Sequence, residues 1–410
     1  MIVSVLGLGY IGLPTAVMFA SHGIQVYGME PKEEICNKLN LGEATFEEGA
    51  LAGLLKQAVN KGMLRCDTVL KPADVYIIAV PTPIYENKRA DVSYVEQATK
   101  NVASLLKKGH LVIIESTISP RLTETMVKPL LEMSGLKAGE DFFLAYCPER
   151  VMMGSIIYEL ENNARIIGGY NEASAQKAQA LYKIFVKGEI YLTDLLTAEI
   201  CKLTENIYRD VNIALANDLA MICEELGCNV WKVVEFANKH PRVHMHLPGP
   251  GVGGHCLAVD PWYLIEHVDG NAKLIRNARE INDQMPQFVA DKVRKILPEG
   301  GKVVILGVAF KADVDDLRES PILHLIENLK QDFEVRVVDP HIEAYNLDIY
   351  DTVKDTNLLL LGVNHSIFNT YDMENICARM KQKNILDTRN FYDSKKLEAL
   401  GFKVCKLGVK

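Results

Sequence analysis

The chain has 410 residues, of which 48% are hydrophobic and 24% charged, a balance typical of a globular protein that is too long for one hydrophobic core. Its formal net charge is -8, and because nucleic-acid-binding domains usually carry a basic excess, we expect no nucleic-acid partner. No apolar run approaches the ~18 residues of a membrane span, so we expect no membrane partner.

The cysteines are nine in number and scattered along the chain, and no CxxC pair occurs. This spacing supports neither a zinc site nor a thioredoxin-like motif, and we expect no metal. The N-terminal stretch MIVSVLGLGYIG has no basic residues before its apolar run, so we interpret it as a first strand rather than a signal peptide. A reduced, cytoplasmic enzyme is the expectation.

The first block, residues 1–190, alternates short β-branched runs with helical stretches. Parallel strands joined by helical crossovers produce this rhythm, so the block predicts a doubly wound, Rossmann-like α/β sheet. The runs that predict strands are IVSVLG, VYGME, VYIIAV, LVIIES, FFLAYC and RIIGG.

The segment from Gly7 to Gly12 reads GLGYIG, a GxGxxG motif that follows the first strand and opens a helix. Gly7 would permit the tight turn, Gly9 would let a pyrophosphate approach the backbone, and Gly12 would let the helix pack on the strand. The helix N-terminus adds amides and a positive dipole for the phosphates. The motif, including Tyr10 and Ile11, therefore predicts an NAD site.

Glu30 ends the second strand, where a carboxylate can accept hydrogen bonds from a ribose diol. Because its charge would repel a 2′-phosphate, it favours NAD over NADP, although Lys32 nearby leaves NADP open. Thr82 in AVPTP and Thr117 in IESTIS follow later strand ends, at the edge where open α/β sheets bind ligands. Both are candidate cofactor-binding residues.

The second block, residues 191–285, contains a long helix. No proline or glycine occurs from Thr197 to Leu226, apolar residues recur at helical spacing, and Gly227 offers a stop. A helix of this length is longer than a crossover needs. It suits a spine between domains or a dimer surface, with an ordinary buried helix as the alternative.

The third block, residues 286–410, again contains apolar runs separated by helical segments. The runs GKVVILGVAF, EVRVVDP, LLLLGV and NILDT predict buried parallel strands. We expect a second Rossmann-like α/β domain, so that two such domains accompany a helical middle.

The stretch PGPGVGGHC, from Pro248 to Cys256, leads a glycine- and proline-rich loop into one thiol. Glycine lets backbone approach a ligand closely, and cysteine is a strong nucleophile. In a nicotinamide enzyme this pairing favours aldehyde-level chemistry. The thiolate adds to a carbonyl, a hydride leaves to the cofactor, and water hydrolyses the remaining thioester.

Such a site needs oxyanion donors and an acid or base. Lys202 and Asn206 lie one helical turn apart, so both project from one face of the long helix, where they could hold an oxyanion. Asp260 and Glu149 are candidate acid–base residues. His255 adjoins the thiol, but neighbouring side chains on extended backbone diverge, so we expect it to shape the loop or to touch substrate.

Seven motifs occur in order over the whole chain: GLGYIG, AVPTP, STISP, CPERV, AEICKLTEN, GPGVGGHCLAVDPW and GVAFKADVDDLRESP. With them the sequence resembles the UDP-glucose/GDP-mannose dehydrogenase family of NAD-dependent nucleotide-sugar 6-dehydrogenases. The resemblance implies an N-terminal NAD domain, a central helical dimerisation domain, hence a homodimer, and a C-terminal nucleotide-sugar domain. It also implies a four-electron oxidation of the sugar C6 alcohol to a carboxylate, with two NAD reduced.

Carried over motif by motif, the resemblance implies a division of labour around the thiol. Cys256 would be the nucleophile that forms the thiohemiacetal and the thioester. Lys202 and Asn206 would stabilise the oxyanion, and Asp260 would help to activate water.

The resemblance extends to residues in the other motifs. Glu149 and Thr117 would assist proton transfer and water placement. Arg318 in LRES would lie near the cofactor phosphates, and Arg242 in HPRVH would reach substrate, in this family often from the partner subunit. The substrate contacts implied by the resemblance are Glu149, Arg150, Lys202, Asn206, Arg242, His255 and Lys311.

One stretch departs from the glucose branch of the family, where a serine usually precedes the cysteine and a lysine precedes the aspartate. His255 and Val259 occupy those positions here. GGHC followed by AVDPW resembles the N-acetylhexosamine branch instead. This implies UDP-N-acetyl-D-mannosamine as the UDP-sugar substrate, with UDP-N-acetylglucosamine or another nucleotide sugar as the alternative.

Two rival functions fit parts of the sequence. A hydroxyacid-type dehydrogenase would perform one oxidation with Lys202 as base and would leave Cys256 without a chemical role. An NAD-sensing binding protein would bind the cofactor but would form no NADH from a nucleotide sugar.

Overall fold

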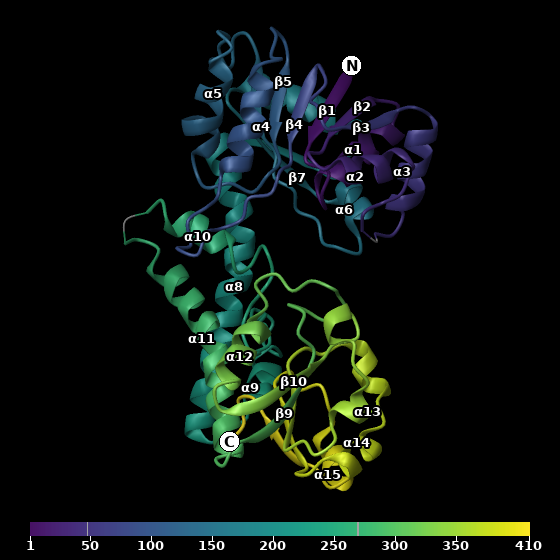
Figure 1. Cartoon of the computed structure of the whole chain (residues 1–410). Helices are drawn as coiled ribbons and strands as arrows, with labels where there is room; N and C mark the ends of the chain where they lie inside the picture. The colour runs from purple at the N-terminus through teal and green to yellow at the C-terminus, as the bar shows by residue number, and fades with distance from the viewer. Residues whose placement is uncertain (47, 269) are drawn as a thin grey trace. The chain divides into compact units, whose positions relative to one another are not determined.

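The computed structural model describes residues 1–46, 48–268 and 270–410. They form two compact units, Met1–Glu205 with Trp262–His267, and Asn206–Pro261 with Val268–Lys410. Figure 1 follows the chain through its helices and strands. Within these residues, no helix combines the length and the apolar character that crossing a membrane requires.

The first unit is built on a sheet with the strand order β3-β2-β1-β4-β5-β6-β7-β8. Its first six strands have the 3-2-1-4-5-6 order of a dinucleotide-binding sheet, which confirms the predicted Rossmann-like fold. β7 departs from the parallel prediction, because it pairs antiparallel with β6. The strands are β1 Ile2–Leu6, β2 Gln25–Met29, β3 Leu64–Asp67, β4 Val75–Ile78, β5 Leu111–Ile114, β6 Phe143–Tyr146, β7 Arg165–Gly169 and β8 Ile190–Asp194.

Both faces of this sheet are buried, because successive side chains of its central strands enter different hydrophobic cores. Ile77 belongs to the core that α1, α3, α6 and α7 cover, and Ile78 belongs to the core that α4 and α5 cover. Strands buried on both faces are near-continuous apolar runs, which is why the sequence predicts them. The helical segments are α1 Gly12–Ser21, α2 Glu33–Asn40, α3 Leu51–Asn60, α4 Ser93–Ala103, η1 Thr123–Val127, α5 Lys128–Glu132, α6 Ile156–Asn162 and α7 Glu172–Tyr182.

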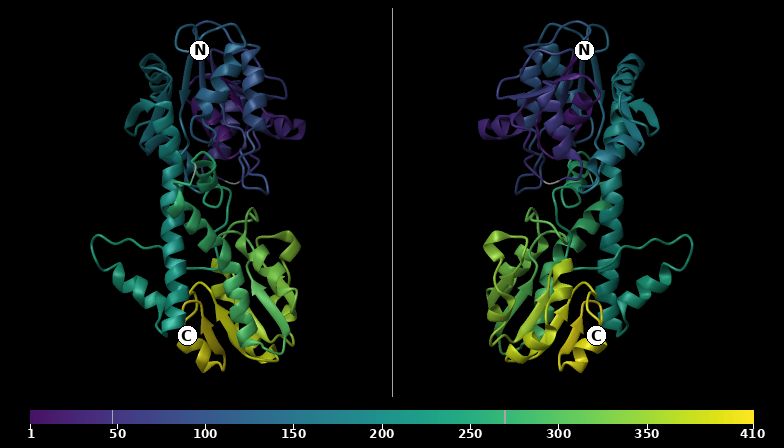
Figure 2. Two further views of the ribbon diagram at one scale, coloured as in Figure 1. Left: turned by 90° about the vertical axis from the view of Figure 1, so that its left-hand side faces the viewer. Right: turned by 90° about the vertical axis from the view of Figure 1, so that its right-hand side faces the viewer.

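The predicted long helix is confirmed: α8 spans Leu195–Leu226 as one continuous helix (Figure 2), and the chain passes from the first unit to the second within it. Three further helices follow in the chain, α9 Val230–Ala237, α10 Asp260–Ile265 and α11 Lys273–Ile296.

Pro286, at which the sequence places the start of the third block, lies inside α11. A proline removes one helix hydrogen bond. The helix nevertheless continues, because Met285, Val289 and Val293 are buried in a core of the second unit and most helical stability comes from such packing.

The second unit contains a parallel sheet with the order β10-β9-β11-β12-β13, which confirms the predicted second α/β domain. This is the 2-1-3-4-5 order of flavodoxin-like sheets, whose ligands bind at the switch point between the first and third strands, here β9 and β11. The strands are β9 Gly301–Leu306, β10 Phe333–Val338, β11 Leu358–Leu361, β12 Asn384–Asp387 and β13 Lys403–Lys406. The remaining helical segments are α12 Pro321–Leu329, η2 Glu343–Tyr345, α13 Ile349–Thr352, η3 Ser366–Thr370, α14 Met373–Arg379 and α15 Ser394–Ala399.

Candidate active site

The three glycines of the turn after β1 differ in how closely other atoms approach them. Gly7 has a φ of 88°, and a Cβ there would lie 2.6 Å from the carbonyl oxygen of Ala79. A Cβ on Gly12 would lie 1.9 Å from the carbonyl oxygen of Gly7, whereas a Cβ on Gly9 would meet no atom within 4 Å. The fold therefore requires Gly7 and Gly12, while Gly9 leaves open backbone that a phosphate could approach.

Glu30 lies directly against this turn. Its Oε2 accepts the backbone N–H of Leu8 at 3.3 Å, and its Oε1 accepts the backbone N–H of Lys32 at 3.4 Å. These donors hold the carboxylate at the end of β2, beside the glycine turn. The arrangement fits the ribose of NAD, which is the contact that the sequence predicts.

The N-terminus of α1 suits an anion. Ile11 is the N-cap residue, and its side chain has no atom that could accept a hydrogen bond from the first helical amides. Tyr10 is partly buried, and its ring packs on Phe46 with the ring centroids 4.4 Å apart. The helix end thus fits the pyrophosphate of NAD.

Thr82 and Thr117 follow the carboxyl ends of β4 and β5, and both are partly buried. The Thr82 carbonyl accepts the hydroxyl of Tyr263. Ser119, just after Thr117, donates its hydroxyl to Glu266 at 2.7 Å. Both partners come from α10 and the residue after it, so this segment contacts the loops that follow two neighbouring strands.

The loop after β6 carries Glu149 and Arg150. Glu149 Oε2 accepts Nη2 of Arg165 at 3.1 Å, and Oε1 accepts the backbone N–H of Arg150 at 2.6 Å. The Arg150 guanidinium pairs with Glu205 at 2.6 Å, beside a cavity of about 280 Å³ that both residues line. The structure therefore holds both predicted residues in ion pairs.

Glu115, just after β5, is a second buried carboxylate near Arg165. Its oxygens accept the hydroxyls of Tyr182 at 2.5 Å and Thr15 at 3.2 Å, and Arg165 Nη1 lies 3.7 Å away. Burial raises the pKa of the Glu115 carboxyl to about 7, while Arg165 opposes the rise and Glu149 adds to it. Glu115 is therefore poised to titrate near neutral pH.

In the second unit, Cys256 opens the turn that leads into α10. Its carbonyl accepts the backbone N–H of Asp260 at 2.8 Å. Asp260 is buried and accepts the side-chain amide of Asn206 on α8, while Asn206 Oδ1 accepts the guanidinium of Arg209. The structure thus connects three predicted residues, Cys256, Asp260 and Asn206.

Lys202 lies one turn earlier on α8 and is partly buried. The boundary between the two units falls between Lys202 and Asn206.

The glycines of the segment 248–256 are required by the protein itself. A Cβ on Gly253 would lie 2.3 Å from the carbonyl oxygen of Glu319. One on Gly254, whose φ is 88°, would lie 2.9 Å from the Phe310 ring. The sequence suggests close approach to a ligand, but the observed neighbours are residues of the loop after β9. These contacts fix the backbone that leads to the thiol.

Asp316, in the same loop, lies near two predicted residues. Its carboxylate pairs with Arg318 at 2.6 Å and lies 4.0 Å from the His255 ring. Burial opposes ionisation, but the hydrogen bonds from Arg318 outweigh it and lower the pKa of the Asp316 carboxyl. The Arg318 carbonyl also accepts the backbone N–H of Gly254 at 3.1 Å. Arg318, which the sequence assigns to the cofactor, is thus tied to the thiol segment.

Lys311 lies in this loop too, and a buried histidine anchors the loop. His365 Nδ1 accepts the backbone N–H of Asp313 at 2.9 Å, so the ring proton sits on Nε2, 3.1 Å from Asp339 Oδ2. The same carboxylate oxygen accepts the backbone N–H of Val308 at 2.7 Å. The pair of Asp339 and His365 therefore holds the loop on both sides of Lys311.

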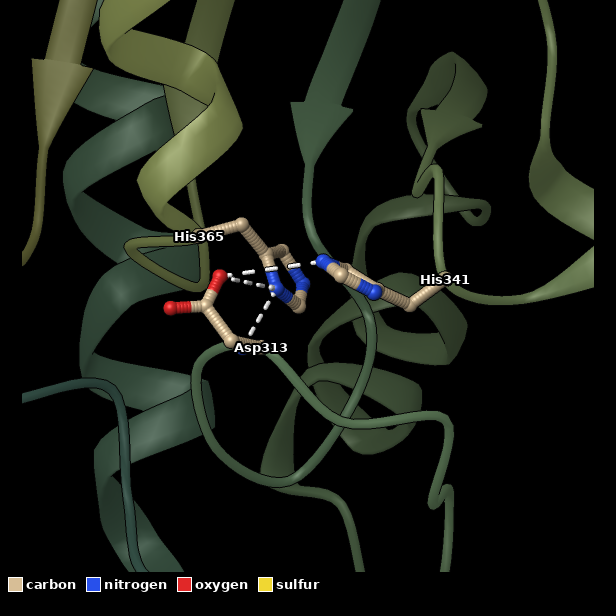
Figure 3. A group of neighbouring side chains, drawn as sticks. All are labelled: Asp313, His341 and His365. Atoms are coloured by element: carbon tan, nitrogen blue, oxygen red, sulfur yellow. Dashed lines mark hydrogen bonds and ion pairs between the residues drawn. The ribbon is translucent and has the colours of Figure 1, made fainter. Parts of the chain in front are cut away.

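Asp313, His341 and His365 lie close together in this region (Figure 3), and each offers an atom that could bind a metal, all within 4.8 Å of one another. His341 Nε2 lies 3.7 Å from the Asp313 carboxylate. However, the His365 nitrogen that faces Asp313 already accepts an amide N–H. A cation would have to displace that hydrogen bond, so the geometry is that of a loop anchor.

A buried polar chain fixes the start of the glycine-rich segment. Asp210 on α8 accepts the Arg279 guanidinium of α11 at 2.5 Å and the Asn282 amide at 2.8 Å. Asn217 donates to Asn282 at 2.9 Å and accepts the backbone N–H of Gly249 at 2.8 Å. α8, α11 and the segment are therefore joined by hydrogen bonds with defined geometry.

Arg242 lies in the segment between α9 and Pro248, which stands away from the rest of its unit in both views of Figure 2. The arginine is exposed, and its backbone N–H donates to His240 Nδ1 at 3.3 Å. This placement is compatible with the predicted contact with a partner subunit.

Sequence reasoning missed several charged residues of these regions. Arg165 and Glu115 stand at the ends of buried runs, RIIGG and LVIIES, where they look like strand boundaries. Arg209 follows Asn206 by one helical turn. Arg389, after β12, donates Nε to the Gly362 carbonyl at 3.2 Å, and burial lowers its pKa to about 10. For Glu115 and Arg389 the available signal is a charge at the carboxyl end of a buried parallel strand. Arg165, at the start of β7, and Arg209, on α8, give no such signal.

Three regions of the chain each match a domain of one known protein family. Residues 1–186 match the NAD binding domain of the UDP-glucose/GDP-mannose dehydrogenase family. Residues 196–284 match the central domain of that family, and residues 304–394 match its UDP binding domain.

The chain is similar to named proteins over nearly its whole length. UDP-N-acetyl-D-mannosamine dehydrogenase of Methanocaldococcus jannaschii is 45% identical over 417 residues, which cover 99% of this chain and 96% of that protein. NDP-N-acetyl-D-galactosaminuronic acid dehydrogenase of Ralstonia solanacearum is 42% identical over 416 residues, with 97% of each chain covered. The solved structure of UDP-D-ManNAc dehydrogenase from Pyrococcus horikoshii is 42% identical, with a TM-score of 0.95 and coverage of 100% of this chain and 99% of that one.

Proposed function

We propose that this chain, which belongs to the UDP-glucose/GDP-mannose dehydrogenase family and is an NAD-dependent nucleotide-sugar dehydrogenase, oxidises UDP-N-acetyl-D-mannosamine at C6 to the uronate. The observation that carries the proposal is the connected group of Cys256, Asp260 and Asn206, which joins a thiol turn to a buried carboxylate. His255 and Val259 beside it fit the N-acetylhexosamine branch. Relatives named for the mannosamine sugar share 45% and 42% identity with the chain.

The first oxidation converts the C6 alcohol to an aldehyde. The hydroxyl proton passes to solvent water, a transfer that Thr117 and Glu149 assist, and a hydride leaves the carbon. When bound, NAD accepts one hydride in each of the two oxidations. The open backbone at Gly9 and the N-terminus of α1 at Ile11 hold its pyrophosphate, and Glu30 holds its ribose. The other residues proposed to bind the cofactor are Gly7, Tyr10, Gly12, Thr82, Thr117 and Arg318.

The second oxidation proceeds on the enzyme. The Cys256 thiolate adds to the aldehyde carbon, forms a C–S bond and leaves a thiohemiacetal oxyanion. Lys202 and Asn206 donate to that oxygen. The Asn206 amide carries two hydrogens and gives one to Asp260, so the other serves the oxyanion. Loss of a second hydride from C6 then leaves a thioester.

Hydrolysis completes the reaction. Water attacks the thioester carbon, and Asp260 accepts one of its protons. Cleavage of the C–S bond returns the thiolate and releases the carboxylic acid, which gives its second proton to solvent and leaves as the carboxylate. Thr117 and Glu149 assist proton transfer and water placement. The remaining residues proposed to contact the UDP-sugar are Arg150, Arg242, His255 and Lys311.

The test is a count of NADH formed per sugar consumed. Purified protein is incubated with NAD and one sugar at a time: UDP-N-acetylmannosamine, UDP-N-acetylglucosamine, UDP-N-acetylgalactosamine or UDP-glucose. Two NADH and the mass of the uronate from the mannosamine sugar, with little from the others, support the proposal. Two NADH from a different sugar would reject this substrate, and one NADH would reject the thioester.

A second candidate substrate is another UDP-N-acetylhexosamine. The Ralstonia solanacearum relative, named for N-acetyl-D-galactosaminuronic acid, is 42% identical, close to the identity of the mannosamine relatives. The same four-sugar comparison separates these substrates.

We also propose a homodimer that forms through α8. Tyr208, Leu215 and Ile222 recur every seven residues and therefore share one helix face. Their exposed fractions are 58%, 49% and 41%, and a stripe of exposed apolar side chains is typical of an interaction surface. In such a dimer, Arg242 of one subunit reaches the substrate of the other.

A further inference from the structure

We propose that Arg165 is a positioning residue that orients the carboxylate of Glu149 for the oxidation. The inference rests on the proposed function, because Arg165 acts only through Glu149. It goes beyond the family resemblance, which draws attention to the loop CPERV but not to the strand opposite it.

The contacts of Glu149 leave its carboxylate little freedom. Arg165 Nη2 donates to Oε2 at 3.1 Å, and the backbone N–H of Arg150 donates to Oε1 at 2.6 Å. The side chains of Glu149 and Arg165 are only 6% and 5% exposed. Because each oxygen has its own donor, the plane of the carboxylate is fixed, and one lone pair on each oxygen remains directed elsewhere.

Arg165 is itself held rigidly. It starts β7, whose antiparallel pairing with β6 sets it opposite the loop that carries Glu149. Its guanidinium carbon lies 4.5 Å from the centroid of the Tyr182 ring, and Nη1 donates to Cys147 Sγ at 3.6 Å. A planar guanidinium stacked on a ring presents its fork in one direction. Burial raises the pKa of the Cys147 thiol to about 12, so this partner stays neutral.

The cluster also joins three segments of the proposed site. Glu115, 3.7 Å from Arg165, directly precedes the strand-end loop that carries Thr117. Its Oε2 accepts the hydroxyl of Thr15, from the helix that follows the glycine turn. Arg165 thus connects Glu149 to Glu115. Through Glu115 it is also connected to the loop of Thr117 and to α1, the helix that follows the glycine turn.

Stability alone is a poor reason for this arrangement. Two carboxylates and one guanidinium are removed from water here, and the desolvation cost of buried ion pairs commonly equals or exceeds their attraction. Replacing a buried ion pair by hydrophobic residues of similar volume is often neutral or stabilising for a protein. What an ion pair supplies, and an apolar side chain does not, is a directed hydrogen bond to one particular oxygen.

A double-mutant cycle tests the inference. The proteins are wild type, Arg165→Lys, Glu149→Gln and the double variant, each checked for its melting temperature and its Kd for NAD. Arg165→Lys keeps the positive charge but loses the planar set of guanidinium N–H donors. We expect kcat to fall about 100-fold, because a small misplacement of the Glu149 carboxylate can cost that much, and we expect the Kd for NAD to stay unchanged. In the Glu149→Gln background the same change should alter kcat less than about twofold, because coupled residues are not additive.

Each other outcome has one meaning. If Arg165→Lys lowers kcat equally in both backgrounds, or leaves kcat of the folded protein unchanged, the inference is wrong. If Glu149→Gln alone leaves kcat unchanged, the proposed role of Glu149 fails and the inference fails with it. If Arg165→Lys does not fold, Tyr182→Leu replaces it in the cycle, since it removes the ring beneath the guanidinium. The NADH count of wild type tests the overall reaction independently.

Discussion

Asn206 on α8 donates its side-chain amide to the carboxylate of Asp260, a residue 54 positions away in the sequence. Both are almost fully buried, with exposed fractions of 2% and 3%. A buried carboxylate that accepts a directed hydrogen bond has a fixed orientation. The pair therefore sets the direction in which Asp260 can take a proton, at the far end of the turn that Cys256 opens.

Replacing Asp260 by asparagine should slow hydrolysis of the thioester more than it slows oxidation. The variant keeps the size of the side chain but loses the base, so kcat should fall about 10²- to 10⁴-fold. A first burst of NADH should appear while the protein retains the sugar on Cys256. Rapid-mixing absorbance and intact-protein mass spectrometry measure both. A slow variant without the adduct would contradict the role, and Cys256→Ala, which forms no adduct, is the control.

Replacing glycine by alanine should lower the stability of the protein at Gly12 and weaken the binding of NAD at Gly9. Gly12→Ala places its Cβ 1.9 Å from a backbone oxygen and Gly9→Ala meets no atom within 4 Å. We expect Gly12→Ala to cost about 3 kcal/mol of stability through overpacking. Gly9→Ala should keep the melting temperature and raise the Kd for NAD about tenfold, or ~1.4 kcal/mol. Calorimetric titration and thermal melts measure both; an unchanged Kd for Gly9→Ala would remove Gly9 from the NAD site.

Glu115 should make stability depend on pH in a defined window. Its pKa is about 7 in the folded chain and 4.5 without the fold, so between these values only the folded chain holds the proton. Stability should therefore fall as pH rises through this window, by at most ~1.4 kcal/mol per pH unit. Glu115→Gln should flatten this slope. Melting temperatures across the window measure it, with the exposed Glu34→Gln as control; equal slopes in all three proteins would contradict the burial argument.

The sequence predicts the inner strands of both sheets and the edge strand β10, but it misses the other three edge strands, β3, β8 and β13. The reason is burial: Leu358–Leu361 of β11 is buried at every position, whereas Lys403–Lys406 of β13 has no buried position. An edge strand has only one neighbour and often one wet face, so it lacks the continuous apolar run that identifies its central partners.

The candidate site was predictable where its chemistry is local. A GxGxxG turn and a glycine-rich approach to Cys256 are visible in a few adjacent letters. The pairings of Asn206 with Asp260 and of Glu149 with Arg165 join segments that are far apart or on different strands. The spacing of apolar residues does not reveal which distant segments will meet. In the sequence, a charged residue at the end of a strand looks the same whether its side chain is in water or paired with a buried partner.

A charge on the exposed face of α8 should separate the proposed dimer. Leu215 is 49% exposed, and Leu347, in the C-terminal domain, is also 49% exposed, so the two leucines form a matched pair. If α8 forms the interface, Leu215→Glu buries a charge on association and should give a monomer, whereas Leu347→Glu should leave the dimer intact. Light scattering coupled to gel filtration measures the masses.

Because Arg242 is proposed to act across the interface, the Leu215→Glu monomer should also show a raised KM for the UDP-sugar. A wild-type monomer, or a dimer that Leu215→Glu leaves unchanged, would place the interface elsewhere or remove it.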